Sequence, residues 1–147
     1  MRVPLVVYVP GAEPRRVAEK RSHIDVAPTI LELAALPRPE GRELQGTSLL
    51  ADVFAPAGAE LDERDVLVDM PKGPFNELRR AVITGKSPGT KLLHFGGVYY
   101  NLFDLAEDPA EKNDLSSDKE RLSAAIARLQ AMRGRLKEFE VKEDEKK

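Results

Sequence analysis

The hydrophobic pattern begins with one unbroken apolar run, from Leu5 to Val9, bounded by Pro4 and Pro10. Apolarity without alternation is typical of a strand that is buried on both faces, inside a parallel sheet covered by helices. The rest of the chain offers no obvious neighbours for such a strand. We therefore expect this run to belong to a larger α/β domain whose earlier part is missing.

A helix is predicted from about Asp25 to Ala35. Apolar residues recur there at helical spacing and predict one broad apolar face: Val26, Ala27, Ile30, Leu31, Leu33 and Ala34. Asp25 is the expected N-cap, and Pro28 falls in the first turn, where its missing N–H leaves no intrahelical bond unmade. Pro37 and Pro39 are expected to end the helix.

Strand-like segments follow, within and after a loop-rich stretch from Arg38 to Pro74. They are Asp65 to Met70, Leu78 to Thr84, Thr90 to Phe95 and Val98 to Phe103. Gly96 and Gly97 separate the last two segments, and a Gly-Gly pair favours a two-residue hairpin because both positions can adopt positive φ. The pattern predicts a small antiparallel sheet of three or four strands.

The final helix has the clearest pattern. Ser117 and Glu120 have the spacing of a capping box. An apolar stripe follows: Leu122, Ala125, Ile126, Leu129, Met132, Leu136 and Phe139. We expect this stripe to pack across one face of the small sheet, and we expect the charged residues 140–147 to form a disordered tail.

Composition narrows the class of protein. A length of 147 residues suits one domain, and 23 lysines and arginines against 25 acidic residues give a formal charge of −2. That balance offers no basic field for nucleic acid and no polybasic membrane anchor, and no apolar run approaches the ~20 residues of a membrane-spanning helix. The absence of cysteine excludes disulfides and thiolate metal sites within the chain and leaves its compartment open.

The histidines offer little candidate chemistry. His94 lies in a strand-like run, without nearby partners for a site, so we interpret it as structural. His23 precedes Asp25 by two residues, and such a pair can share a metal ion or a proton. Because Asp25 is the expected N-cap, the structural interpretation is again preferred.

A run of carboxylates from Asp104 to Asp114 resembles a calcium site only superficially. It lacks the central glycine and the oxygen spacing of an EF-hand loop. A turn fits better, opened by Asp108-Pro109 and ended by Asn113 in a left-handed conformation. The chain also lacks a glycine-rich phosphate loop and a Gly-x-Ser-x-Gly elbow. These residues therefore predict no catalytic, cofactor-binding or metal-binding position.

The order of short motifs nevertheless resembles the C-terminal third of the sulfatase family. The matching segments are Arg2 to Gly11, Ser22 to Ala34, Gly46 to Leu50 (the family's Gly-x-Ser-Leu element), Lys91 to Leu93 and Asn101 to Leu105 (its closing hairpin), and Asp108 to Leu115 (its Asp-Pro-x-Glu-x-x-Asn-Leu turn). Each motif is weak alone, but the set falls in order over residues 2 to about 115.

The resemblance implies an alkaline-phosphatase-like α/β fold with a large N-terminal domain and a smaller C-terminal one. Sulfatases hydrolyse sulfate esters with a formylglycine made from cysteine or serine, beside a divalent metal that is usually calcium. The family's nucleophile and metal-binding motifs would lie upstream of this chain. No catalytic, cofactor-binding or metal-binding residue is therefore carried over.

We accordingly predict an α/β fragment followed by an α+β part. Residues 1–50 would be the C-terminal end of the sulfatase α/β domain, with one strand and one helix. Residues 51–139 would be the C-terminal α+β subdomain, and 140–147 the tail. The expected function is the C-terminal part of a sulfuric ester hydrolase, inactive by itself, that supplies scaffold and pocket-rim loops, with Arg38 to Pro74 the favoured rim.

Two alternatives stay open at this stage. The parent protein could be a phosphodiesterase or phosphonate hydrolase of the same superfamily. The chain could instead be a non-catalytic binding or assembly module that pairs through an exposed sheet edge at Leu5 to Val9. The expected partner is the missing N-terminal sulfatase region or a second copy of the chain.

Overall fold

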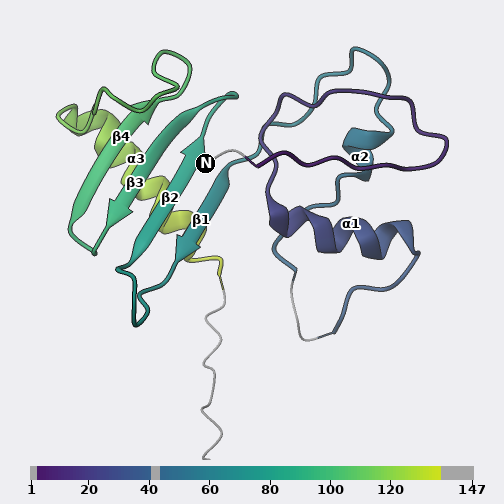
Figure 1. Cartoon of the computed structure of the whole chain (residues 1–147), viewed down its shortest axis with the longest axis horizontal. Coiled ribbons are helices and arrows are strands. Elements are labelled where there is room, and N and C mark those ends of the chain that lie inside the picture. Colours follow the sequence, from purple (N-terminus) through teal and green to yellow (C-terminus); the bar gives the residue numbers. More distant parts are fainter. Residues whose placement is uncertain (1–2, 41–43, 137–147) are drawn as a thin grey trace, which may run out of the picture. The chain divides into compact units, whose positions relative to one another are not determined.

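The structure, a computed structural model, describes residues 3–40 and 44–136 (Figure 1). The chain divides into two compact units: unit 1 comprises Met1–Val66 with Gly85–Pro88, and unit 2 comprises Leu67–Thr84 with Gly89–Lys147. The first boundary between the two compact units follows Val66. The sequence predicts a boundary between family domains at residue 50, and that boundary stays a prediction.

Unit 2 is built on an antiparallel sheet, as predicted. Its strands are β1 (Val66–Met70), β2 (Arg79–Thr84), β3 (Thr90–Phe95) and β4 (Tyr99–Asp104), in the spatial order β1-β2-β3-β4. Strand β3 pairs antiparallel with β2 on one side and β4 on the other. Each strand follows its neighbour in sequence, so hairpin turns set the whole register.

The turn between β3 and β4 forms as the Gly-Gly pair predicts. Gly96 and Gly97 have φ angles of 58° and 80°. The N–H of Val98 donates to the carbonyl oxygen of Phe95 at 3.0 Å, which closes the turn. Positive φ at both central residues matches the twist of the flanking strands, so the turn continues the sheet without a break.

The core of unit 2 lies between the sheet and α3 (Lys119–Arg133), which runs across one face of the sheet (Figure 1). Its buried members are Val82, Leu92, Leu102, Ala125 and Leu129. Val82, Leu92 and Leu102 are register partners and so share one face of the sheet, while Ala81 and Phe103, whose side chains point to the other face, are buried as well. The predicted packing of the final helix across the sheet is confirmed, and its stripe from Leu122 to Met132 contributes to this core.

The start of α3 differs from the prediction. The N-cap is Asp118, whose side chain accepts a hydrogen bond from the N–H of Arg121 at 3.1 Å. The capping box predicted for Ser117 and Glu120 is wrong by one position, because aspartate is an equally good cap one residue later. Leu136 lies beyond the end of the helix, while Phe139 and the tail 140–147 fall outside the described residues.

Unit 1 contains little regular structure: a 3₁₀ turn η1 (His23–Asp25), α1 (Val26–Leu33) and a short helix α2 (Leu50–Val53) that the sequence did not predict. Helix α1 ends before the prolines that were expected to stop it. Ala35 takes a left-handed φ of 52°, and the N–H of Leu36 donates to the carbonyl oxygen of Leu31 at 2.9 Å. This is a Schellman ending, which satisfies the last carbonyls locally.

The predicted strand from Leu5 to Val9 does not form. The segment is extended but pairs with no strand among the described residues, and Val6 and Tyr8 are 91% and 86% exposed. A buried strand needs neighbours on both edges to satisfy its backbone, and the described residues supply none. The place of this segment in a larger sheet therefore stays a prediction.

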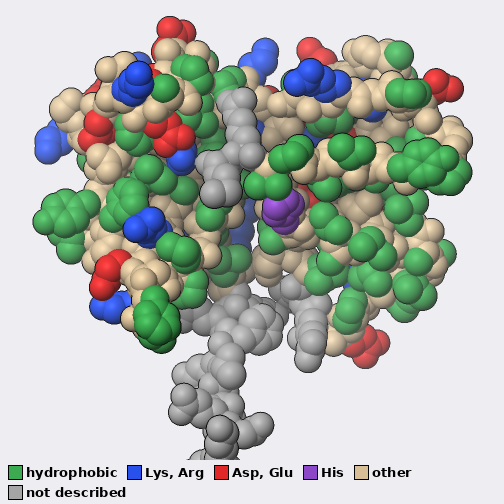
Figure 2. Space-filling model, viewed as in Figure 1, with side chains coloured by type: hydrophobic (Ala, Val, Ile, Leu, Met, Phe, Trp, Pro, Cys, Tyr) green, Lys and Arg blue, Asp and Glu red, His purple; other side chains and the backbone are tan. Residues whose placement is uncertain are grey.

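Helix α1 buries Pro28 and Thr29 and leaves part of its apolar face exposed. Thr29 is only 4% exposed, whereas Ile30 and Leu33 are 57% and 46% exposed. Figure 2 shows hydrophobic side chains gathered over unit 1 in the region of this helix. The broad apolar face that the sequence predicts is only partly covered within the described part of unit 1, because Val26 and Leu31 are half-buried while Ile30 and Leu33 are exposed.

Candidate functional site

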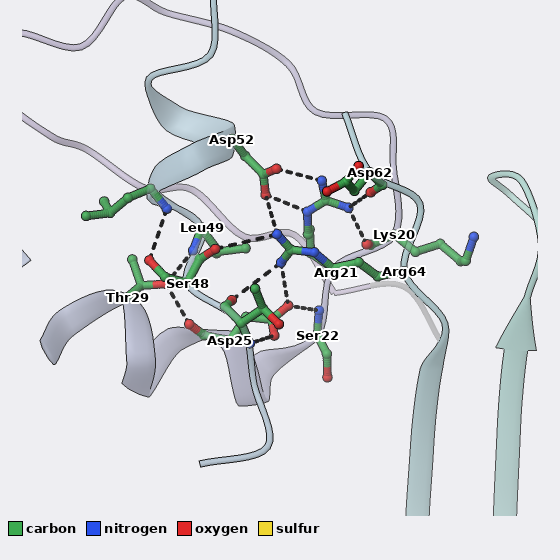
Figure 3. A network of polar contacts seen from close by, with 12 residues as sticks. Lys20, Arg21, Ser22, Asp25, Thr29, Ser48, Leu49, Asp52, Asp62 and Arg64 are labelled. Carbon is green, nitrogen blue, oxygen red and sulfur yellow. Dashed lines mark hydrogen bonds and ion pairs between the residues drawn. The ribbon is translucent and has the colours of Figure 1, made fainter. Parts of the chain in front are cut away.

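A buried network of charged side chains organises unit 1 (Figure 3). Arg21, which precedes η1, donates from Nε and Nη2 to the two carboxylate oxygens of Asp52 on α2, at 2.5 and 2.7 Å. The side chains of Arg21 and Asp52 are 9% and 7% exposed. A two-pronged guanidinium–carboxylate pair fixes both distance and orientation, so it fixes α2 against the segment before η1.

The contacts between Arg21 and Asp52 stabilise the charged forms of both side chains. Burial alone would raise the pKa of the Asp52 carboxyl, but the hydrogen bonds from Arg21 and the positive charges of Arg21 and Arg64 lower that pKa below its usual value. The hydrogen bond to Asp52 likewise raises the pKa of the Arg21 guanidinium. The remaining nitrogen of Arg21, Nη1, donates to the carbonyl oxygens of Lys20 and Asp62 at 2.7 and 3.1 Å. Asp52 is therefore an ionised structural anchor.

Asp25 is the second buried carboxylate, with 4% of its surface exposed. Its oxygens accept hydrogen bonds from the backbone N–H groups of Ser22 and Thr47, at 3.0 and 2.9 Å. The guanidinium of Arg64 lies 3.6 Å from Asp25 and 3.7 Å from Asp52, and so bridges the two carboxylates. Asp25 occupies the N-cap position of α1, as predicted, but its side chain makes no cap hydrogen bond to that helix and instead bonds back to Ser22 and across to Thr47.

The Gly-x-Ser-Leu element lies directly against this helix start. Thr29 donates from Oγ1 to the carbonyl oxygen of Asp25 at 2.6 Å and accepts from the N–H of Leu49 at 2.9 Å. A Cβ atom at Gly46 would lie 2.0 Å from the carbonyl oxygen of Ile24. Only glycine permits that approach, so the first residue of the motif has a packing role.

A smaller cluster joins Gly85–Pro88 to the rest of unit 1. Glu63 accepts hydrogen bonds from the backbone N–H and the hydroxyl of Ser87, both at 2.8 Å, and pairs with Nζ of Lys20 at 3.0 Å. The backbone bond from Ser87 and the contacts with Lys20 outweigh desolvation and lower the pKa of Glu63 to about 2. The Glu63 carboxylate therefore also has a structural role.

The implied calcium and formylglycine do not fit these residues. The carboxylates of Asp25 and Asp52 already face guanidinium and backbone N–H groups, which leaves no oxygen cluster for a cation. Among residues 3–40 and 44–136, no group of three or more histidine, cysteine, aspartate or glutamate side chains could hold a metal ion. His23 is exposed on η1 and joins no such group.

His94, the other candidate from the sequence, lies in the core of unit 2. It is 8% exposed and stacks on Tyr100 with ring centroids 4.4 Å apart and planes 6° from parallel. Neither ring nitrogen has a hydrogen-bond partner in the part of the chain that the structure describes. The arrangement is a packing contact between the two rings.

The carboxylate run forms a turn. Asp104 accepts from the N–H of Ala106 at 2.9 Å, and Asp108 accepts from that of Asn113 at 2.7 Å. The left-handed residue is Glu111, with φ of 55°, so placing that conformation at Asn113 was wrong. The side chains of this run bond back to their own loop, so they do not converge on a shared centre.

Asp114 ties this turn to β4. It accepts hydrogen bonds from the backbone N–H groups of Leu102 and Ser116 at 3.0 and 2.9 Å, and from the side-chain amide of Asn101 at 2.7 Å. Desolvation opposes these bonds, but together they lower the pKa of Asp114 to about 2. The ionised form is therefore the one that the fold stabilises.

Comparison with known proteins decides the family. The family described as N-sulphoglucosamine sulphohydrolase, C-terminal, matches residues 1–142. The chain belongs to this family. It is thus the C-terminal region of a sulfatase, as the order of motifs predicted, and its four-stranded sheet with a packed helix is the C-terminal fold of these enzymes.

Solved structures of sulfatases share this fold. One, a protein in complex with its substrate D-glucosamine-2-N,6-O-disulfate, matches with a TM-score of 0.58 and 20% identity over 75% of this chain and 23% of its own. Another, a putative sulfatase from Bacteroides thetaiotaomicron, matches with a TM-score of 0.50 and 22% identity over 77% of this chain and 26% of its own. The chain spans about a quarter of each, and no curated protein matches it.

The sequence did not reveal the network around Arg21 and Asp52. The two residues are 31 positions apart, and no local motif marks either of them.

None of the described helices is long and apolar enough to span a bilayer. The prediction that the chain carries no catalytic residue stays a prediction.

Proposed function

We propose that this chain completes a sulfatase that removes sulfate from an amino sugar, and that it contributes architecture while another segment supplies the reacting groups. The family description, an N-sulphoglucosamine sulphohydrolase, supports the substrate class. The calcium and formylglycine of the family would belong to that other segment, since the buried carboxylates of Asp25 and Asp52 already accept hydrogen bonds from arginine and backbone N–H groups.

One observation carries the proposal: unit 1 is unfinished on its apolar side. The extended segment Leu5 to Val9 and the outer face of α1 present exposed apolar side chains, among them Val6 at 91%, Ile30 at 57% and Leu33 at 46%. Large exposed apolar side chains of this kind are typical of an interaction site. An unpaired apolar segment and a helix with an exposed apolar face are what remain when a sheet is removed from an α/β layer.

The relatives indicate what would cover this surface. This chain covers only 23% and 26% of the two solved sulfatases, which leaves about three quarters of each for other structure. We propose that the equivalent three quarters supplies a parallel sheet, to which Leu5 to Val9 adds a strand and on which α1 lays its apolar face. Backbone pairing and apolar burial would then complete unit 1.

The test is reconstitution of activity. Sulfate release from an aryl sulfate and from N-sulphoglucosamine is measured, with calcium, for the chain alone and after co-expression with a segment equivalent to the uncovered three quarters. We expect no turnover from the chain alone and turnover from the pair. Sulfate release by the chain alone would contradict the proposal. No sulfate release by a well-folded pair would also contradict it and would favour a non-catalytic assembly module.

Matched variants locate the contact. Ile30→Asp places a charge on the proposed buried face, whereas Val68→Asp places one on β1 at nearly the same exposure, 53% against 57%. We expect Ile30→Asp to abolish reconstitution and Val68→Asp to preserve it, because burying an unpaired carboxylate is strongly unfavourable. Equal effects of the two variants would show that the face of α1 is not the contact.

Self-association is the second candidate for the same surface. An unpaired apolar strand can also pair with its counterpart in a second copy. Sedimentation of the chain alone distinguishes the two: a stable dimer that Ile30→Asp dissociates would favour assembly between copies. The structure offers no observation that favours a phosphodiester or phosphonate substrate over a sulfate.

A further inference from the structure

The face of the sheet that points away from α3 carries a row of three side chains at its hairpin end. Arg79 on β2 pairs in register with Phe95 on β3, which pairs with Tyr99 on β4. Val82, Leu92 and Leu102 form the core under α3, so the alternation of strand residues places Arg79, Phe95 and Tyr99 on the opposite face. The row is thus fixed by the most regular part of the fold.

The row combines an aromatic platform with an available cation. The guanidinium carbon of Arg79 lies 5.8 Å from the centroid of the Phe95 ring, within the range of a cation–π contact, and Tyr99 beside it is 72% exposed. Arg79 forms no ion pair with any residue of the described chain. The next residue, Arg80, points to the other face and pairs with Asp69 at 2.9 Å.

The loops at this end hold the row in place. The N–H of Gly96 donates to the carbonyl oxygen of Leu78 at 2.9 Å and so ties the β3–β4 turn to the start of β2. Exposed apolar side chains flank it: Val98 is 69% exposed in the β3–β4 turn, and Phe75 in the β1–β2 loop is 101% exposed. A rigid backbone that presents exposed rings is suited to a flat ligand.

We infer that Arg79, Phe95 and Tyr99 form a binding site for a sulfated sugar ring, which rests on the proposed function for its ligand class. The exposed tyrosine ring offers a flat apolar surface to the C–H face of a pyranose. The guanidinium can donate two parallel hydrogen bonds to sulfate oxygens. A sulfated sugar supplies both complements in one small molecule, a flat apolar face and an anion beside it.

The uncompensated charge favours this ligand over a protein surface. Burying Arg79 beneath an apolar partner would leave a guanidinium without a counter-ion, which is strongly unfavourable. An anionic sugar brings its own counter-ion and leaves the site partly hydrated. The row would thus hold a sugar unit through contacts that take no part in bond cleavage.

Binding is tested on the whole chain without any turnover. N-sulphoglucosamine and unsulfated glucosamine are titrated into the ¹⁵N-labelled chain, and amide shifts are followed by NMR. We expect shifts centred on β2–β4 near Arg79 and Tyr99 with the sulfated sugar, with a Kd on the order of a millimolar for so small a ligand. Absence of shifts at the row at saturating sugar would overturn the inference.

Variants separate the two halves of the site. Tyr99→Ala should weaken binding of both sugars, whereas Arg79→Gln should weaken only the sulfated one, by about tenfold, since a hydrogen-bonded charge is lost. Arg79→Lys should retain part of the affinity, and binding by this variant would show that a substitution at this position leaves the fold intact. Lys72→Gln is the matched control: it removes a cation, 70% exposed, that already pairs with Glu77, and should change nothing.

Each remaining outcome is decisive. Equal weakening by Lys72→Gln and Arg79→Gln would reduce the effect to general charge attraction and overturn the inference. Shifts at the row that occur only with the complementary sulfatase segment, and never with sugar, would reassign the row to assembly. Failure of reconstitution with sugar binding intact would instead contradict the proposed function and leave this site standing.

Discussion

The two units bury different proportions of polar and apolar side chains. Unit 2 encloses Val82, Leu92 and Leu102 at 1%, 1% and 0% exposure, whereas unit 1 encloses Asp25 and Asp52 at 4% and 5%, with Leu49 at 5%, and leaves many other aliphatic side chains exposed. Unit 2 is organised around an apolar core between its sheet and α3. Unit 1 is organised by directional polar contacts, and much of its apolar surface is exposed. Four predictions challenge this contrast.

The largest expected effect comes from equal truncations in the two units. Leu102→Ala in unit 2 removes a side chain with 0% exposure and should destabilise that unit by about 4 kcal/mol, through lost burial and a cavity. Ile30→Ala in unit 1, at 57% exposure, should change stability by less than about 0.5 kcal/mol. Amide hydrogen exchange reports each unit separately. Comparable losses in both would refute the contrast.

The next effect concerns the polar network of unit 1. Asp52→Ala leaves the guanidinium of Arg21 buried without its counter-ion and should lower the stability of unit 1 by about 3 kcal/mol. Lys72→Ala breaks an ion pair with side chains 70% and 68% exposed and should cost no more than about 0.5 kcal/mol. Exchange rates of the α1 amides measure the first loss, and unchanged rates would mean that the network adds little.

Close packing around η1 should give a smaller effect. Gly46→Ala forces a Cβ atom against the carbonyl oxygen of Ile24, at 2.0 Å without rearrangement, and should destabilise unit 1 by about 2 kcal/mol. Gly134→Ala is the control, since its nearest neighbour lies at 3.5 Å. Chemical denaturation followed by NMR compares the two. A neutral Gly46→Ala would show that the backbone there relaxes freely.

The smallest effect is a pH dependence shared by both units. The pKa values of Glu63 and Asp114 fall from 4.5 and 3.8 to about 2. A lowered folded pKa adds stability above the unfolded value, and that stability is lost as the pH falls through the folded pKa. Both units should thus weaken between about pH 4.5 and 2. Glu63→Gln and Asp114→Asn should each flatten the acid limb of their own unit, and carboxyl titration by NMR checks the values.

Sequence reasoning succeeded where structure is local. Four strands, the Gly96-Gly97 turn and the stripe of α3 were predicted because hairpins and helices are encoded over a few residues. The order of short motifs carried the family for the same reason, since each motif serves a turn or a close approach, as at Gly46.

The failures came from contacts that the chain alone does not encode. Leu5 to Val9 has the pattern of a buried strand, yet a strand needs neighbours to pair with, and the pattern cannot supply them. The Arg21–Asp52 pair joins residues 31 positions apart, so no periodicity marks it. The helix caps are a different case. Asp25 occupies the predicted N-cap position of α1 but uses its side chain elsewhere, and Asp118 caps α3 in place of Ser117, because several polar residues at a helix start compete for one role.

The bond between the backbone N–H of Lys20 and the hydroxyl of Ser87 spans 67 positions, which has a consequence for synthesis on the ribosome. Unit 1 cannot close until Ser87 has left the exit tunnel. The β2–β3 and β3–β4 hairpins join immediate neighbours and close quickly once their residues are free. Unit 2 is completed later still, because its core also needs Ala125 and Leu129 of α3. Unit 1 can therefore close before unit 2, while the apolar side chains of Val6 and Tyr8 stay exposed.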